Sequence, residues 1–144
     1  MKKQSDTKSG REPPSRTVFY LDENVDCGTI VTALRRLDIC IERHRDHFLP
    51  GEDDVVWLPA VAERGWVIIT KDRDPQRHPI VRDAFLAAKA KVFILRAKDL
   101  TGEGLANLLS DRIRKMDRLA RNTRAPCLFK VTAANVLRVE VPGR

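Results

Sequence analysis

The sequence predicts an α/β fold of three layers, with helices on both faces of a mostly parallel central sheet. Short apolar runs of strand length alternate along the chain with longer segments whose apolar residues recur at helical spacing. Such alternation is typical of right-handed crossovers between parallel strands. The last two apolar runs are separated only by a turn at Ala134-Asn135, which predicts a C-terminal hairpin.

Each element has its own local signal. Buried strands are predicted where β-branched, aromatic and aliphatic residues run together, at 18–21, 39–41, 66–70 and 92–95. A helix from about Asp26 to Leu37 follows the first strand, and a second begins near Asp53 and stops at Gly65. Pro79 opens a third helix that reaches Ala88. The fourth helix spans 102–121, and the hairpin strands are 127–131 and 136–141.

Length and composition place the chain among globular proteins. Its 144 residues suffice for one domain, and 42% are hydrophobic and 33% charged. We expect residues 1–16 to form a flexible basic arm and residues 17–144 to form the domain. No apolar run approaches the roughly 20 residues that a membrane span needs. The three cysteines are scattered, which fits a reducing compartment and predicts a cytoplasmic protein with no membrane partner.

Acidic residues gather where the chain leaves a predicted strand or enters a predicted helix. Leu21-Asp22-Glu23-Asn24 follows the first strand, Asp53-Asp54 opens the second helix, and Thr70-Lys71-Asp72-Arg73-Asp74 follows the third strand. Ligands of parallel sheets collect at the carboxyl ends of the strands, so these acids should face one crevice. Carboxylates brought together repel one another unless a cation lies among them, and carboxylate oxygens favour Mg²⁺ or Mn²⁺.

A basic chain surrounds this acidic crevice. The net charge is +7, which makes a polyanionic partner plausible. Carboxylate-bound metal ions activate water and stabilise the oxygens of a phosphodiester displacement, so the sequence favours metal-assisted cleavage of a nucleic acid. Lys71 and Arg73 are suited to contact phosphate beside the acids. A second set of phosphate contacts is expected from the fourth helix, at Arg112, Lys115, Arg118 and Arg121.

The order and spacing of the motifs resemble the PIN domain, and most closely its short VapC-type members. The resemblance rests on L-D-E-N at 21–24, D-x-x-W at 54–57 and I-T-K-D at 69–72, and it covers about residues 17–142. It implies a PIN-like α/β/α fold and a Mg²⁺- or Mn²⁺-dependent endoribonuclease, the toxin of a type II toxin–antitoxin pair. RNA would be the substrate and an antitoxin protein the partner, and a homodimer is compatible with the family.

Matched by position, the resemblance assigns the catalytic and metal-binding roles to Asp22, Asp54 and Asp72. Only about 30 residues separate the first two, so the helical insertion that supplies a fourth acid in larger members is missing. Asp74 and Glu23 are the first candidates to replace it as metal ligands, followed by Asp26 and Asp53.

Alternative interpretations remain open at this point. The chain could be a catalytically inactive PIN-like module that binds nucleic acid or a protein. A receiver-like phosphoacceptor is a further rival, although no lone Asp follows a central third strand in the way that function requires. A zinc site at His44, His47 and His78 and a thiol nucleophile at Cys27 have weaker support, because no matching ligand or base falls at a suitable spacing.

Overall fold

The structure is a computed structural model, and it describes residues 16–71, 74–97 and 100–141. Asp72 and Arg73, which the sequence places at the crevice, and nearly all of the predicted basic arm lie outside these described residues. The described strands form a single six-stranded sheet in the order β2-β1-β3-β4-β5-β6. Their bounds are Val18–Leu21 (β1), Cys40–Arg43 (β2), Val67–Thr70 (β3), Lys91–Leu95 (β4), Cys127–Val131 (β5) and Val136–Val139 (β6).

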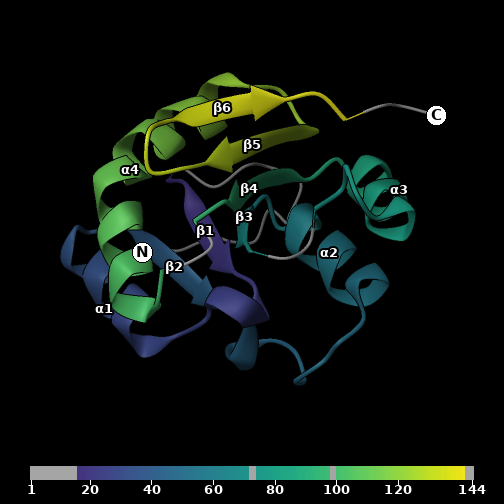
Figure 1. Ribbon diagram of the computed structural model, residues 1–144. Coiled ribbons are helices and arrows are strands. Elements are labelled where there is room, and N and C mark those ends of the chain that lie inside the picture. Colours follow the sequence, from purple (N-terminus) through teal and green to yellow (C-terminus); the bar gives the residue numbers. More distant parts are fainter. Residues whose placement is uncertain (1–15, 72–73, 98–99, 142–144) are drawn as a thin grey trace.

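Helices cover both faces of this sheet, so the predicted three-layer α/β/α architecture is confirmed (Figure 1). The helices are Gly28–Arg36 (α1), Asp54–Glu63 (α2), Pro79–Ala88 (α3) and Gly102–Asn122 (α4). One pair, α1 and α4, packs on one face, and the other pair, α2 and α3, packs on the opposite face. Strands β1 to β5 are parallel and β6 is antiparallel to β5, which confirms the predicted hairpin.

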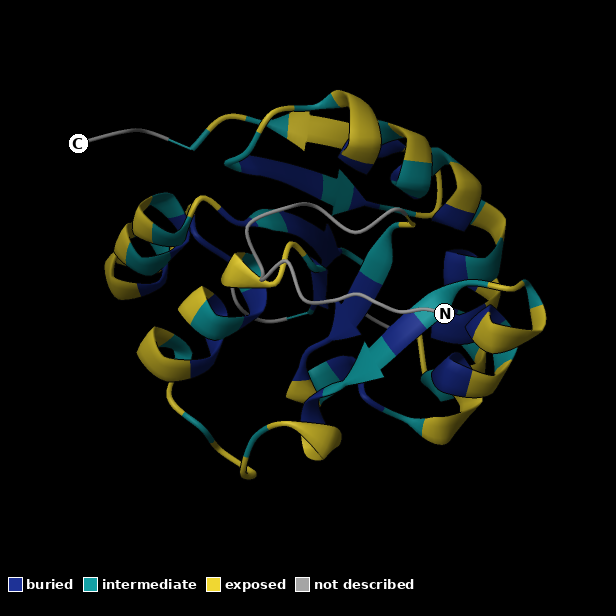
Figure 2. Cartoon of the chain, turned by 180° about the vertical axis from the view of Figure 1, so that it is seen from behind, coloured by how far each residue is buried: buried dark blue, intermediate teal, exposed yellow. Residues whose placement is uncertain are grey.

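The core is divided by the sheet into two apolar clusters. Side chains of successive strand residues point to opposite faces, so each central strand contributes to both clusters. Covering both faces explains why the strands read as continuous apolar runs rather than alternating ones. The chain seen from behind is darkest along its central strands, and the exposed residues lie on the outer sides of the helices, on the outermost strand and in the loops (Figure 2). The fully buried aromatic residues are Phe19, Tyr20, Trp57, Phe85, Phe93 and Phe129.

Several boundaries differ from the prediction by one or two residues, and two of these differences lie beside the crevice. The first helix begins at Gly28 rather than near Asp26, because Glu23–Val25 form a separate 3-10 turn (η3) for which Asp26 is the C-terminal cap. Strand β2 extends to Arg43 instead of ending at Ile41. It is an edge strand, where the polar residues Glu42 and Arg43 can be accommodated, so the apolar run alone underestimates its length.

Phe93 is the aromatic centre of the cluster under α1 and α4. Its ring stacks on Phe129 of the neighbouring strand at a centroid distance of 4.8 Å and meets Phe19 edge-on at 6.4 Å. Phe93→Ala should therefore lower the free energy of unfolding by about 3–5 kcal/mol through lost burial and the cavity left behind. Urea denaturation measures this loss. Leu137→Ala removes an apolar side chain that is 53% exposed, and an equal loss there would contradict a special role for Phe93.

Candidate functional site

The candidate site lies beside β1, where the order of the strands in the sheet changes direction. From β1 the chain adds β2 on one side and β3 on the other, and open α/β sheets bind ligands at such a switch point. Asp22 directly follows β1, and Thr70 is the last residue of β3. The amide of Asp22 donates to the carbonyl of Ile69 at 3.0 Å, and the Thr70 hydroxyl donates to the Asp22 carboxylate at 2.8 Å.

Asp22 is almost completely enclosed, with 1% of its surface exposed. Its second carboxylate oxygen accepts the amide of Glu23 at 2.6 Å and thereby caps the 3-10 turn η3. Burial of a carboxylate is costly unless hydrogen bonds compensate for the lost water, and these donors supply them. The predicted catalytic Asp22 therefore lies at the floor of the crevice and also holds its backbone together.

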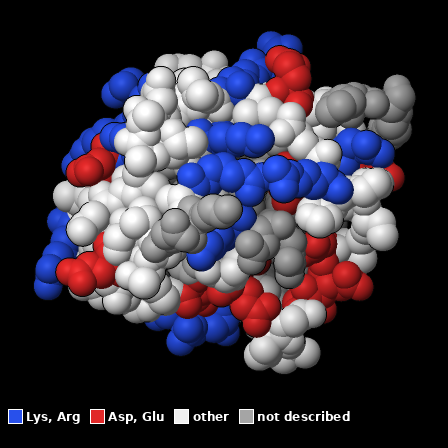
Figure 3. Space-filling model, viewed as in Figure 1, with Lys and Arg blue, Asp and Glu red and all other residues white. Residues whose placement is uncertain are grey.

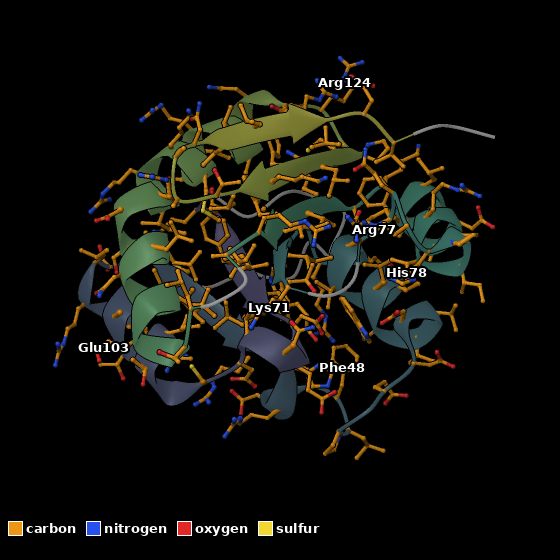
Figure 4. The ribbon with its side chains drawn as sticks, in the orientation of Figure 1. Phe48, Lys71, Arg77, His78, Glu103 and Arg124 are labelled. Atoms are coloured by element: carbon orange, nitrogen blue, oxygen red, sulfur yellow. The ribbon has the colours of Figure 1, made fainter. Side chains whose placement is uncertain are left out.

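The two residues after Asp22 connect the same turn to two further loops. Glu23 accepts the amide of Gly51, in the loop that leads into α2, at 2.9 Å. Asn24 accepts the amide of Lys71, directly after β3, at 3.1 Å. Figure 4 shows Lys71 beside this turn and Phe48 on its other side. We call Asp22, Glu23 and Asn24 the loop clasp, because each side chain fixes a different backbone position around the crevice.

Asp54 lies near Thr70 and comes from the start of α2. It occupies the first turn of α2, where the helix dipole favours negative charge, and Asp53 precedes it as N-terminal cap residue. The indole N–H of Trp57, one turn further along, donates to the Asp54 carboxylate at 3.0 Å. Asp54 and Thr70 line the same small pocket, so the structure brings the predicted Asp54 close to the Asp22–Thr70 pair.

Behind the acids lies a buried polar chain that the sequence does not predict. The hydroxyl of Tyr20 contacts Nδ1 of His44 at 2.6 Å, and Nε2 of His44 is 3.0 Å from the carbonyl of Leu49. A carbonyl only accepts, so Nε2 donates to Leu49, and in the tautomer that carries its proton on Nε2 the Nδ1 atom accepts a hydrogen bond from the Tyr20 hydroxyl. Burial raises the pKa of Tyr20, and the negative charges of Asp22 and other nearby acids raise it further. Tyr20 therefore stays protonated and serves as a donor.

Two acids of the predicted set are held by arginines. Asp26 forms ion pairs with Arg43 at 2.7 Å and Arg45 at 3.2 Å. Asp74, 2% exposed, pairs with Arg96 and lies 3.8 Å from Arg77. These contacts give both carboxylates structural partners on neighbouring strands and loops. The sequence does not predict the Asp74–Arg96 pair, because a complete helix and a complete strand separate the two residues.

The donor chemistry of the crevice suits the predicted cation, although its full ligand set is not contained in the described residues. Asp22 and Asp54 offer carboxylate oxygens, which Mg²⁺ and Mn²⁺ prefer. Within residues 16–71, 74–97 and 100–141, no three His, Cys, Asp or Glu side chains group closely enough to hold a metal ion. The third predicted ligand, Asp72, is outside those ranges. The same finding leaves the weaker zinc alternative without support among the described histidines.

The predicted phosphate contacts fall into two separate places. Lys71 lies at the crevice. The C-terminal part of α4 lies at the opposite end of the sheet, because Lys91, at the start of β4, donates to the carbonyl of Ala120. Arg118 is exposed there, and Arg121 pairs with Asp117. Nearer the middle of α4, Arg112 and Lys115 bind the hairpin turn, at Thr132, Ala133 and Asn135.

Basic and acidic side chains lie next to each other on the face viewed in Figure 1. Figure 3 shows a band of Lys and Arg across the middle of this face and a group of Asp and Glu directly below it. Such a juxtaposition suits a substrate that carries phosphate groups along its length and reacts at a cation-binding centre. None of the helices in the described parts of the chain has the length and apolar character that crossing a bilayer needs.

The ion pairs of Asp26 make the crevice sensitive to acid. Burial by itself would raise the pKa of Asp26, but the hydrogen bonds from Arg43 and Arg45 outweigh it and lower the pKa below its ordinary 3.8. A carboxyl whose pKa falls on folding stabilises the folded state above its unfolded pKa, and this contribution is lost as pH falls through the lower folded value.

Asp26→Asn should therefore lower the free energy of unfolding at neutral pH by about 1–3 kcal/mol, because charge-assisted hydrogen bonds are lost. The difference from the parent protein should shrink as the pH falls below about 4. Urea titrations at several pH values measure it. Asp38→Asn, whose side chain is 93% exposed, serves as control. A difference that stays constant down to acid pH would contradict the assignment.

Comparison with known proteins agrees with the arrangement of the strands and acids. The model of the PIN-like domain family matches residues 17–97, which contain β1 to β4 and all three predicted catalytic aspartates. No curated protein and no solved structure matches the chain significantly. The matched segment is more than half of the chain and includes the whole switch point, and the protein therefore belongs to the PIN-like domain family, a family generally associated with nucleases.

Proposed function

We propose that the protein is a metal-dependent endoribonuclease that uses Mg²⁺ or Mn²⁺. The observation that carries the proposal is that Thr70, at the switch point of a PIN-like sheet, is hydrogen-bonded to Asp22 and lines a small pocket together with Asp54. A divalent cation bound there would lower the pKa of a water and stabilise the attacking and leaving oxygens. Asp22 and Asp54 would hold it, together with Asp72 from the segment after β3.

The surrounding residues have supporting roles in this proposal. Thr70 fixes the rotamer of Asp22 through its hydroxyl, and Trp57 fixes that of Asp54 through its indole N–H. Outer-shell hydrogen bonds of this kind orient metal ligands. Lys71, whose backbone is bound by Asn24, and Arg73 would contact phosphates that flank the cleaved bond. In this scheme Glu23 holds the loop before α2 in place through the Gly51 amide, and Asp74 holds its arginine partners in place.

We further propose that the ribonuclease is the toxin of a type II toxin–antitoxin pair and acts in the cytoplasm. The support is the resemblance of L-D-E-N, D-x-x-W and I-T-K-D to short VapC-type proteins. Expression of the chain should then arrest growth, Asp22→Asn should relieve the arrest, and a cognate antitoxin should suppress it. Equal arrest by the parent and the Asp22→Asn variant would contradict the toxin assignment.

A second function, an inactive PIN-like module that binds RNA, is favoured by one observation. Both carboxylate oxygens of Asp22 accept hydrogen bonds from protein groups, Glu23 and Thr70, as in a purely structural role. The two proposals differ in an assay with labelled RNA. The nuclease cleaves it with added Mn²⁺ and stops on addition of EDTA, whereas the inactive module binds the RNA under both conditions and leaves it intact.

Asp22→Asn and Asp54→Asn should each reduce metal-dependent cleavage by more than the roughly 10- to 100-fold that loss of an outer-shell partner causes. The reason is that each substitution removes a charged ligand rather than a group that orients one. Single-turnover cleavage of labelled RNA measures the rates. Asp83→Asn is the matched control, because that carboxylate lies on the outer surface of α3, paired with Arg82. Unchanged rates in both crevice variants would remove these residues from the mechanism.

Metal binding can be tested without catalysis. A cation that binds the folded crevice should stabilise it by RT ln(1 + [L]/Kd), about 2.7 kcal/mol at a 100-fold excess over Kd. The melting temperature of the parent should therefore rise with added Mn²⁺. In the Asp22→Asn/Asp54→Asn variant the rise should largely disappear, while Asp83→Asn should retain it. Equal rises in all three proteins would place the metal elsewhere.

A further inference from the structure

A row of aligned residues runs from β3 to β6 near the end of the sheet where the parallel strands have their carboxyl ends. Thr70 on β3 pairs with Ile94 on β4, Ile94 pairs with Lys130 on β5, and Lys130 pairs with Leu137 on β6. Paired residues on neighbouring strands point to the same face, and adjacent strands lie about 4.8 Å apart. Lys130 therefore lies about 10 Å from Thr70, on the same face and at the same level as the Asp22–Thr70 pair.

This end of the row is open to solvent. Leu137 is 53% exposed, and Lys130 is only half-buried. No carboxylate among the described residues lies within ion-pair distance of Lys130. An ammonium group in this position is available to a negatively charged ligand that approaches the crevice along the sheet.

Two arginines stand at the same end of β4 and are oriented by one buried carboxylate. One Asp74 oxygen accepts from the Arg96 guanidinium and lies 3.8 Å from Nε of Arg77, while the other accepts the amide of Gln76 at 2.8 Å. The amide of Arg96 donates to the carbonyl of Val131 at 2.8 Å, which places Arg96 directly beside the end of β5 and thus near Lys130.

These guanidinium groups keep donors for a ligand. The Arg77 side chain is 71% exposed and that of Arg96 is 29% exposed, so donors not directed at Asp74 are accessible. A guanidinium fixed by a carboxylate on one side presents its remaining N–H groups in a defined direction, which suits the oxygens of a phosphate. Figure 4 places Arg77 at the position of the basic band in Figure 3, above Lys71.

We infer that Arg77, Arg96 and Lys130 bind the phosphodiester backbone of RNA and lead the strand across the ends of β4 and β5 to the acids. The inference rests on the proposed ribonuclease function and names the surface that holds its substrate. Two of these three cations, Arg77 and Arg96, share a single carboxylate, and Lys130 lies near them without one, so the surface keeps a net positive charge. Asp74 acts as a positioning residue for the two arginines.

The test measures binding of fluorescently labelled single-stranded RNA in EDTA, so that no cleavage occurs, at a series of salt concentrations. Arg77→Gln/Lys130→Met removes two charges and keeps similar side-chain size. If each side chain contacts one phosphate, the slope of log K against log salt should fall by about 1.4, at about 0.7 per contact. Arg118→Gln/Arg121→Gln removes two charges at the far end of the sheet and should leave the slope unchanged.

Asp74→Asn separates orientation from charge, because removal of the negative carboxylate would by itself strengthen RNA binding, whereas loss of orientation would weaken it. It leaves all three cations in place, so the salt slope should be retained while the RNA affinity falls, because the arginines are no longer fixed. A structural role alone would change the melting temperature without changing affinity at a temperature where the variant is fully folded. In that case Asp74 would not be a positioning residue.

The outcomes distinguish this inference from the function on which it rests. A parent protein that cleaves RNA with Mn²⁺, but whose salt slope is reduced by Arg118→Gln/Arg121→Gln and not by Arg77→Gln/Lys130→Met, overturns the inference alone and places the RNA on α4. A parent protein that neither binds nor cleaves RNA overturns the proposed function and the inference together. A lower slope only in the Arg77→Gln/Lys130→Met variant supports the inference.

Discussion

The connection between the ends of β1 and β3 is the constraint on which the crevice depends. Asp22 is bound through its amide to Ile69 and through its carboxylate to Thr70, and both Asp22 and Thr70 are buried. A buried carboxylate and a buried hydroxyl each need a partner, so this pair is stable only when the two strands are adjacent and in register. The proposed catalytic residue is thus also part of the sheet's own hydrogen bonding.

The loop clasp extends this constraint to the rest of the site. Asp22, Glu23 and Asn24 are consecutive at the start of η3. Asp22 binds Thr70 of β3, Glu23 binds the loop before α2, and Asn24 binds the residue after β3, so this one turn fixes all three segments relative to one another. Preorganisation of this kind lets a site bind a cation without rearranging its loops. The pairing of Asp26 and Asp74 with arginines completes the arrangement, since each of these two carboxylates is held by a guanidinium group.

Much of the site follows from local sequence. Asp22 follows a run of apolar residues and Asp54 begins a helix, so both positions relative to the sheet are predictable from hydrophobic periodicity and from the parallel topology. The prediction that α1 starts near Asp26 is wrong for a local reason as well. A 3-10 turn stabilised by the Asp22 cap precedes the helix, and the apolar spacing that predicts the helix cannot distinguish the two.

By itself, then, the sequence determined the alternation of strands and helices, the burial of the strands on both faces and the elements that carry the acids. The tertiary structure decided which side chains meet. The Asp74–Arg96 ion pair and the Tyr20–His44 hydrogen bond each join residues more than 20 positions apart, and the alignment of Lys130 with Thr70 joins strands whose order no local pattern specifies. Strand order is set by packing over the entire sheet, and a pattern of period two or 3.6 contains no information about it.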